Sequence, residues 1–305
     1  MPGDLHEAAW TDEEKAAYAA PILGTVSADG QQWGLPRAFS TKALYWNKDL
    51  FAAAGLPDAA PASWDEMVAA AAAIQEKTDA DGFGMIAADF DNTMHEFLNY
   101  VYTNGGAVLN DAGENVFNSP NNVQAMELYV KLAPLFQPGP TAYDREKLNP
   151  LFAEAQIGMY VSGPWARGLV GDVNWGVAPI PVGPMGQPGT LLITDSLAVF
   201  KGSGVEEQAL SLAKFLTNPD NQFAFDVASG LTPLRKVAGV ADLVAADPTR
   251  AAFLDGIPTG GPEPLVTDYV GLQDAFAAGI QGVVLGELAP ADAVAQIAAA
   301  IDGVL

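Results

Sequence analysis

The stretch WGLPRAFSTKALYWNKDLFAAAGLP, residues 33–57, organises the rest of the chain. Its apolar, aromatic run 43–46 has the character of a strand, because aromatic side chains fit the pleated, half-buried surface of a sheet. Residues 47–49 form a polar elbow into a short helix. Gly55 and Pro57 end that helix, since glycine after the last helical residue and proline soon after it form the usual stop signal.

A second helix follows at once in the segment PASWDEM, residues 61–67. Ser63 and Glu66 have the spacing of a capping box, in which two side chains satisfy backbone N–H groups at the helix start. Asp65 and Glu66 also favour the positive end of the helix. The opening stretch and this segment therefore predict a strand, a polar elbow and two capped helices.

These motifs resemble one family. GLP, ALYWNKDLF, AGLP and P-x-SWDEM are similar to the segment of the extracellular solute-binding proteins of ABC sugar importers, the maltose-binding-protein-like family, in which the chain first crosses between two lobes. Further motifs follow in the family's order, and they are NGG at 104–106, FNSP at 117–120, GPW at 163–165 and GLTPLR at 230–235. The resemblance covers nearly the whole chain.

Composition narrows the function classes. The chain has 305 residues, 50% of them hydrophobic, which suffices for one large or two medium domains. Its 37 acidic and 14 basic residues give a net charge of −23, and we expect no nucleic-acid partner because a phosphate backbone requires a basic face. The absence of cysteine excludes disulfides and thiolate metal sites. No apolar run reaches the roughly 18 residues that a membrane-spanning helix requires.

The amino terminus, residues 1–5, has neither the basic region nor the apolar core of a secretory signal. The resemblance implies such a signal, followed by a first strand-helix-strand unit. We interpret the chain as lacking the start of its first lobe. The resemblance also implies a periplasmic or cell-surface location.

The alternation of strands and helices predicts an α/β architecture with mostly parallel sheets. The resemblance implies the two-lobed periplasmic-binding-protein-like (type II) fold with hinge crossovers, its first lobe incomplete at the amino terminus. It places residues 1–41 and 195–243 in lobe I, and 42–194 and 244–305 in lobe II. The individual elements are then expected as follows: strands at 83–88, 157–161, 175–182 (an edge strand, because prolines interrupt it) and 190–200, and helices at 11–20, 63–77, 93–104, 120–132, 144–155, 205–216 and 219–228.

Trp165 is the strongest candidate for contact with a ligand. A tryptophan on a Gly-Pro turn is held by its backbone and can present a flat apolar face to the C–H face of a sugar ring. The resemblance implies this stacking role. A core tryptophan is the alternative, since aromatic side chains usually bury large areas.

Asp195 interrupts the otherwise apolar segment 190–200. A carboxylate buried there would need hydrogen-bond donors. A hydroxylated ligand supplies them, and so would Arg37, Arg167 or backbone amides.

Further candidates follow from the resemblance. Ser40 lies at the first crossing, where the maltose-binding branch has a ligand-contacting carboxylate. His95, with Thr93 beside it, falls where that branch packs an aromatic residue on the sugar, although a capping or surface histidine is an equal alternative. Arg37 follows the GLP turn and either faces the cleft or pairs with an acid. Tyr269 lies near a helix that can offer an aromatic wall.

Other motifs are set aside. The run Gly82–Ala87 fits G-x-G-x-x-A, but it precedes a predicted strand where a dinucleotide site has a helix. Four aspartates between 79 and 91 have no twelve-residue calcium loop around them. With two histidines the chain cannot form a multi-histidine metal centre. We therefore expect no cofactor and no metal.

The favoured interpretation is a binding protein without a chemical step. The resemblance implies a monomer whose lobes hold a neutral mono- or oligosaccharide in the cleft between them and deliver it to the permease subunits of an ABC transporter. One alternative is a glycosidase-class enzyme that acts on related sugars through two acids. Another is a truncated relative with no transport role.

Overall fold

A computed structural model describes residues 11–28, 30–236 and 239–305. The chain separates into two compact units. Unit 1 comprises Met1–Thr41, Gly163–Trp165 and Leu192–Glu263, and unit 2 comprises Lys42–Ser162, Ala166–Leu191 and Pro264–Leu305. The amino-terminal residues 1–5, on which the signal-peptide expectation rests, lie outside the described residues.

Residues 244–263 belong to unit 1, although the resemblance places them in lobe II. One physical reason is a hydrogen bond of 2.7 Å from the Thr41 hydroxyl to the carbonyl of Phe253. The Phe253 side chain is also buried. The lobe boundaries themselves stay a prediction.

Unit 1 is built on a small sheet in the strand order β3-β8-β9. Strands β3 (Leu35–Ser40) and β8 (Leu191–Leu197) are antiparallel. Apolar side chains from several segments form its core, and they are Tyr18, Ile22, Leu35, Phe39, Leu192, Ala213 and Leu234. The other elements of this unit are α2 (Asp12–Ala16), α3 (Ala20–Gly24), β1 (Ser27–Ala28), β2 (Gln31–Gln32), α9 (Glu206–Leu216), α10 (Pro219–Ala228), α11 (Val240–Ala246), α12 (Ala251–Leu254) and β9 (Gly261–Pro262).

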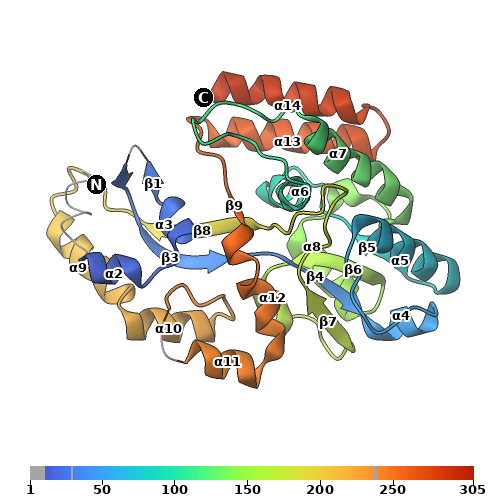
Figure 1. Ribbon diagram of the computed structural model, residues 1–305, viewed down its shortest axis with the longest axis horizontal. Helices are drawn as coiled ribbons and strands as arrows, with labels where there is room; N and C mark the ends of the chain where they lie inside the picture. Colours follow the sequence, from blue (N-terminus) through green and yellow to red (C-terminus); the bar gives the residue numbers. More distant parts are fainter. Residues whose placement is uncertain (1–10, 29, 237–238) are drawn as a thin grey trace. The chain divides into compact units, whose positions relative to one another are not determined.

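Unit 2 contains a four-stranded sheet in the order β5-β6-β4-β7. Its strands are β4 (Ala43–Asn47), β5 (Asp81–Gly84), β6 (Ile157–Ser162) and β7 (Trp175–Ala178). Seven α-helices of the described chain belong to it, and they are α4 (Lys48–Ala53), α5 (Trp64–Lys77), α6 (Asp91–Thr103), α7 (Pro120–Leu132), α8 (Arg145–Ala153), α13 (Tyr269–Val284) and α14 (Pro290–Val304). Helix α13 packs on α14 and α6, and α14 packs on α7 (Figure 1).

The prediction of mostly parallel sheets is wrong. Strand β4 is antiparallel to both of its neighbours, β6 and β7. Of the strand pairs whose register is defined in the described residues, only β5 and β6 run parallel. Helical crossovers enforce parallel pairing only between the strands that they join. That condition holds for β5 and β6, which α6, α7 and α8 separate along the chain. Strand β4 instead lies between two strands that run the opposite way.

Side-chain caps explain where the helices begin. The Asn47 side chain accepts hydrogen bonds from the amides of Asp49 and Leu50 and so starts α4. Ser63 caps α5 as predicted, but the box closes one residue earlier, because Glu66 accepts from the amide of Ala62. Gly55 has φ +74°, which fits its predicted role after α4.

Most of the predicted elements occur, and the differences have local causes. Helices at 120–132 and 219–228 have the predicted ends. The strand expected at 83–88 covers Asp81–Gly84, because the Gln137 side chain binds both the amide and the carbonyl of Met85. The helix expected at 11–20 ends at Ala16, and a separate short helix begins at Ala20. Strand β7 is an edge strand as predicted, although it ends at Ala178.

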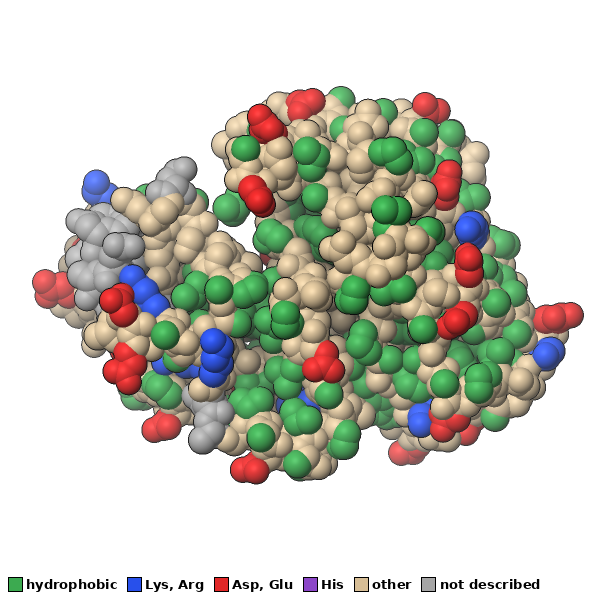
Figure 2. All heavy atoms as spheres, viewed as in Figure 1, with side chains coloured by type: hydrophobic (Ala, Val, Ile, Leu, Met, Phe, Trp, Pro, Cys, Tyr) green, Lys and Arg blue, Asp and Glu red, His purple; other side chains and the backbone are tan. Residues whose placement is uncertain are grey.

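Acidic side chains are scattered over the face shown in Figure 2 and lie on several elements. Such a spread is the usual form of a solvated acidic surface. Within residues 11–28, 30–236 and 239–305, no helix has the length and apolar character needed to cross a membrane.

Candidate functional site

His95 and Tyr269 meet in unit 2. His95 lies on α6 with 7% of its surface exposed, and its Nε2 atom is 3.1 Å from the hydroxyl of Tyr269. Tyr269 is the first residue of α13, whose N-cap Asp268 accepts a hydrogen bond from the amide of Gly271. The cap fixes the helix start, and the hydrogen bond joins two of the predicted site residues.

Thr93 is fully buried on the first turns of α6, two residues before His95. Its hydroxyl donates a 2.6 Å hydrogen bond to the carbonyl of Ala88. Because a hydroxyl has one hydrogen, the oxygen of Thr93 can act toward any further group only as an acceptor.

The helix carrying these residues is anchored by Asn99, which the sequence interpretation missed. Its amide nitrogen donates to the carbonyl of His95 over 2.8 Å. Its oxygen accepts from the Leu191 amide at 2.8 Å and from the Thr190 hydroxyl at 3.2 Å. The signal in the sequence was a polar side chain four residues after His95, on the same face of the helix.

Trp165 follows β6 at the predicted Gly-Pro turn. The turn opens a 3₁₀ helix, Pro164–Gly168, and the indole is half-buried. A Cβ atom at Gly163 would lie 2.2 Å from the indole ring, so the ring occupies space that only glycine leaves open. The indole is therefore held close to its own turn, with part of its surface exposed.

Ser40 and Asp195 lie on neighbouring strands of unit 1. In the register of β3 and β8, Ser40 pairs with Ile193 and Ala38 pairs with Asp195. Ser40 is buried. Asp195 is exposed, so its carboxylate does not depend on buried hydrogen-bond donors. Strand β8 is buried only at its start, and its second half reaches the surface.

Arg37 packs against α10. Its guanidinium lies 3.3 Å from the centre of the Phe225 ring, and its Nη1 atom donates to the Gln222 side chain over 3.4 Å. Burial lowers the pKa of Arg37, an effect that the carboxyl of Asp226 opposes. These contacts give Arg37 a packing role inside unit 1.

Asp226 is the buried acid of this group. It accepts hydrogen bonds from Gln222 at 2.7 Å and from the Leu234 amide at 3.0 Å. Burial raises its pKa to about 6, against the lowering effect of those hydrogen bonds and of Arg37. The side chain ties α10 to the GLTPLR segment, 230–235.

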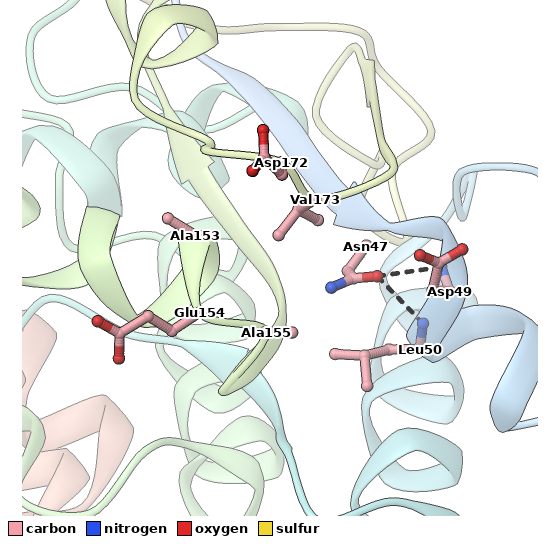
Figure 3. A pocket seen from close by; sticks show the side chains of 8 residues that line it. All are labelled: Asn47, Asp49, Leu50, Ala153, Glu154, Ala155, Asp172 and Val173. Carbon is pink, nitrogen blue, oxygen red and sulfur yellow. Dashed lines mark hydrogen bonds between the residues drawn. The ribbon is translucent and has the colours of Figure 1, made fainter.

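A surface pocket of about 350 Å³ lies in unit 2 (Figure 3). Asp49, Glu154 and Asp172 contribute carboxylates to it. Across the described chain, however, no group of three acidic or histidine side chains is placed to hold a metal ion. The pocket also lacks every predicted site residue.

Comparison with known proteins identifies the family to which this chain belongs. Residues 2–252 match the family of bacterial extracellular solute-binding proteins. A protein of Brucella abortus (strain 2308), named as a binding protein, is 31% identical over 301 residues, which are 96% of this chain and 73% of that protein.

Two solved structures resemble the whole chain. A maltose-bound protein of T. maritima is 27% identical with a TM-score of 0.83, and the alignment covers 96% of this chain and 78% of that one. An ABC transporter solute-binding protein of Thermotoga lettingae, bound with α-D-tagatose, is 26% identical with a TM-score of 0.85. That alignment covers 99% of this chain and 79% of the other. These similarities confirm the predicted two-lobed α/β fold.

Proposed function

Because this chain belongs to the family of bacterial extracellular solute-binding proteins, we propose that it is the solute-binding component of an ABC importer for a neutral mono- or oligosaccharide. The protein acts as a monomer outside the cytoplasmic membrane, in the periplasm or at the cell surface. It hands its solute unaltered to the permease subunits, without a cofactor, a metal or a chemical step.

The observation that carries the sugar assignment is the similarity to two sugar-bound proteins. Both alignments cover at least 96% of this chain, at 26% and 27% identity. One of those proteins holds maltose and the other α-D-tagatose. A hydroxyl-rich, uncharged solute is the chemistry that these two ligands share.

The candidate residues suit such a solute. Small-molecule sites combine apolar faces with a few polar groups that fix orientation. Trp165 and the His95–Tyr269 pair supply flat faces, whereas Ser40 and Asp195 supply hydrogen-bonding oxygens. Thr93 is a weaker candidate, since it is fully buried and its hydroxyl already donates to Ala88. Arg37 is a weaker candidate, since α10 already engages its guanidinium.

Titration calorimetry with a panel of maltose, α-D-tagatose, a galactooligosaccharide and a sugar phosphate tests the proposal. We expect heat of binding from at least one neutral sugar and none from the sugar phosphate. Each sample is then analysed by chromatography. Recovery of intact sugar supports a binding protein, whereas cleaved sugar would establish the glycosidase alternative. A chain that binds no sugar of a broad panel would overturn the assignment.

A further inference from the structure

The interior of unit 2 contains a group of polar side chains from three helices. Glu96 and Tyr100 lie on α6, Tyr129 on α7 and Arg145 on α8, and all four are buried. None belongs to the proposed sugar site. Tyr100 and Tyr129 pack edge to face with ring centroids 5.8 Å apart, and helices α6 and α7 pack together.

Six polar atoms of this group have no hydrogen-bond partner among the described residues. They are both carboxyl oxygens of Glu96, Nε and Nη2 of Arg145, and the hydroxyls of Tyr100 and Tyr129. Buried polar groups are nearly always paired, and each exception calls for an explanation, of which an ordered water or ion is one. A set of unpaired atoms is therefore a stronger signal than a single one.

The unpaired atoms are chemically complementary. Arg145 offers two donors, Glu96 offers carboxyl oxygens that accept, and each tyrosine hydroxyl can do both. Buried waters typically make about three hydrogen bonds to such groups. A water between the carboxyl and the guanidinium would satisfy both without a direct contact between them.

Electrostatics places these groups close together. Burial raises the pKa of Glu96, and the charge of Arg145 opposes that rise. Burial lowers the pKa of Arg145, and the charges of Glu96 and Asp91 oppose that fall. Arg145 also donates from Nη1 to the side chain of Asn92, in the first turn of α6. One positive group thus faces two acids on the same helix.

We propose that Glu96, Tyr100, Tyr129 and Arg145 form an internal water-binding site in unit 2, in which the Glu96 carboxyl is protonated and donates a hydrogen bond to bound water. The positive charge of Arg145 is then balanced by Asp91. This site is separate from the solute site, and it holds α6, α7 and α8 together through water.

Protonation follows from the surroundings of Glu96. Burial raises its pKa to about 8, which the charge of Arg145 only partly opposes. The other titratable groups near it are the tyrosines of α6 and α7, together with Tyr160 of β6 and Asp91, which both interact with Arg145. His95, the preceding residue, is hydrogen-bonded to Tyr269 of α13.

The raised pKa of Glu96 determines whether the stability of the folded protein rises or falls with pH. The folded protein keeps the Glu96 proton up to about pH 8, whereas the unfolded chain loses it near the model-peptide value of 4.5. The stabilisation is complete below that lower value and is lost as the pH rises through about 8. Each pH unit between the two lowers the folding equilibrium constant by up to about tenfold.

Urea denaturation of the wild type and Glu96→Gln between pH 5 and pH 8 tests the proposal. Glutamine imitates the protonated acid, so we expect the wild type to lose up to about a thousandfold in folding constant relative to Glu96→Gln across this range. Glu76→Gln makes the same change at an exposed position of α5 and should retain the wild-type dependence. If the folding constants of the wild type and Glu96→Gln change with pH in the same way, the proposal that the Glu96 carboxyl is protonated is overturned.

A crystal structure of the wild-type protein at neutral pH tests the water directly, and it does not depend on the folding of any variant. We expect ordered water within hydrogen-bond distance of Glu96 and Arg145. A direct ion pair between the two side chains with no water beside them would overturn the site. Neither outcome depends on sugar binding, so a failure here leaves the proposed function standing, and the reverse also holds.

Discussion

The Nε2 atom of His95 lies 3.1 Å from the hydroxyl of Tyr269, which is 174 residues later in the chain. The contact joins the first turns of α6 to the first residue of α13. His95 is buried and Tyr269 is half-buried, so this tyrosine brings the pair to the surface of unit 2. The two side chains therefore form a local unit that a single substitution can disrupt.

Replacing Tyr269 by phenylalanine removes the hydroxyl but keeps the ring. The buried imidazole then loses a hydrogen-bond partner, which typically costs about 1–3 kcal/mol. If His95 helps to hold the sugar, Tyr269→Phe should also lower affinity by roughly tenfold, since about 1.4 kcal/mol corresponds to that factor. Calorimetry checks the affinity and urea denaturation checks the stability. A loss of stability with unchanged affinity would make the pair purely structural.

Trp165→Ala should lower sugar affinity by at least about tenfold. The variant loses the flat face and the buried area of an indole, which is worth more than 1.4 kcal/mol in a typical contact. Trp33→Ala serves as the matched control, because Trp33 is 43% exposed in the segment after β2 and is not a site candidate. Equal affinities for the Trp165 variant and the wild type would remove that residue from the site.

The raised pKa of Asp226 predicts that the stability of unit 1 depends on pH. Its pKa is raised from 3.8 to about 6 in the folded protein, so the folded state binds the proton more tightly than the unfolded chain does. The protonated Asp226 carboxyl stabilises the folded state fully below about pH 4. This stabilisation is lost as the pH rises to about 6, which lowers the free energy of unfolding by up to about 3 kcal/mol. Denaturation of Asp226→Asn across this range should show a smaller decline than the wild type. Asp220→Asn, an exposed acid of the same helix, should follow the wild type. The same slope in all three proteins would contradict the prediction.

Gly82→Ala should destabilise unit 2 strongly. A Cβ atom there would lie 2.2 Å from the carbonyl oxygen of Ala71, on the α5 backbone, which cannot turn aside as a side chain can. Overpacking of this kind costs about 1–3 kcal/mol or more. Gly303→Ala in α14 meets no atom within 4 Å and should be neutral or slightly stabilising. Thermal unfolding compares the two variants, and equal melting temperatures would show that β5 can move away from α5.

Local signals predicted the elements well. The cap at Ser63 and the stop at Gly55 depend on neighbouring residues only, and α5 and α4 occur where those signals lie. Strand direction depends on which strands become neighbours, and no short-range pattern reveals that β4 inserts between β6 and β7. The run Gly82–Ala87 was expected to precede a strand, but the glycines at 82 and 84 lie inside β5, whereas a dinucleotide motif has its glycines after the strand, at the start of a helix.

The site was harder to predict for the same reason. His95 and Tyr269 were each proposed separately, but their contact follows from the packing of α13 on α6. Asp195 was proposed because it interrupts an apolar segment, but the neighbouring residues do not reveal that β8 leaves the core before reaching it. Glu96 and Arg145 carry no mutual sequence signal, since they lie 49 positions apart on different helices.

Helices α13 and α14 close unit 2 from the far end of the chain, and Asn115 donates hydrogen bonds to Ala298 and Asp302 of α14. These two helices follow all four strands of the unit 2 sheet along the chain, yet they cover α6 and α7. A polypeptide cut before Tyr269 would keep every strand of that sheet but would expose Phe97 of α6, which packs against Phe276 of α13. Exposed apolar surface of this kind favours aggregation, so the sheet depends on a segment that contributes no strand to it.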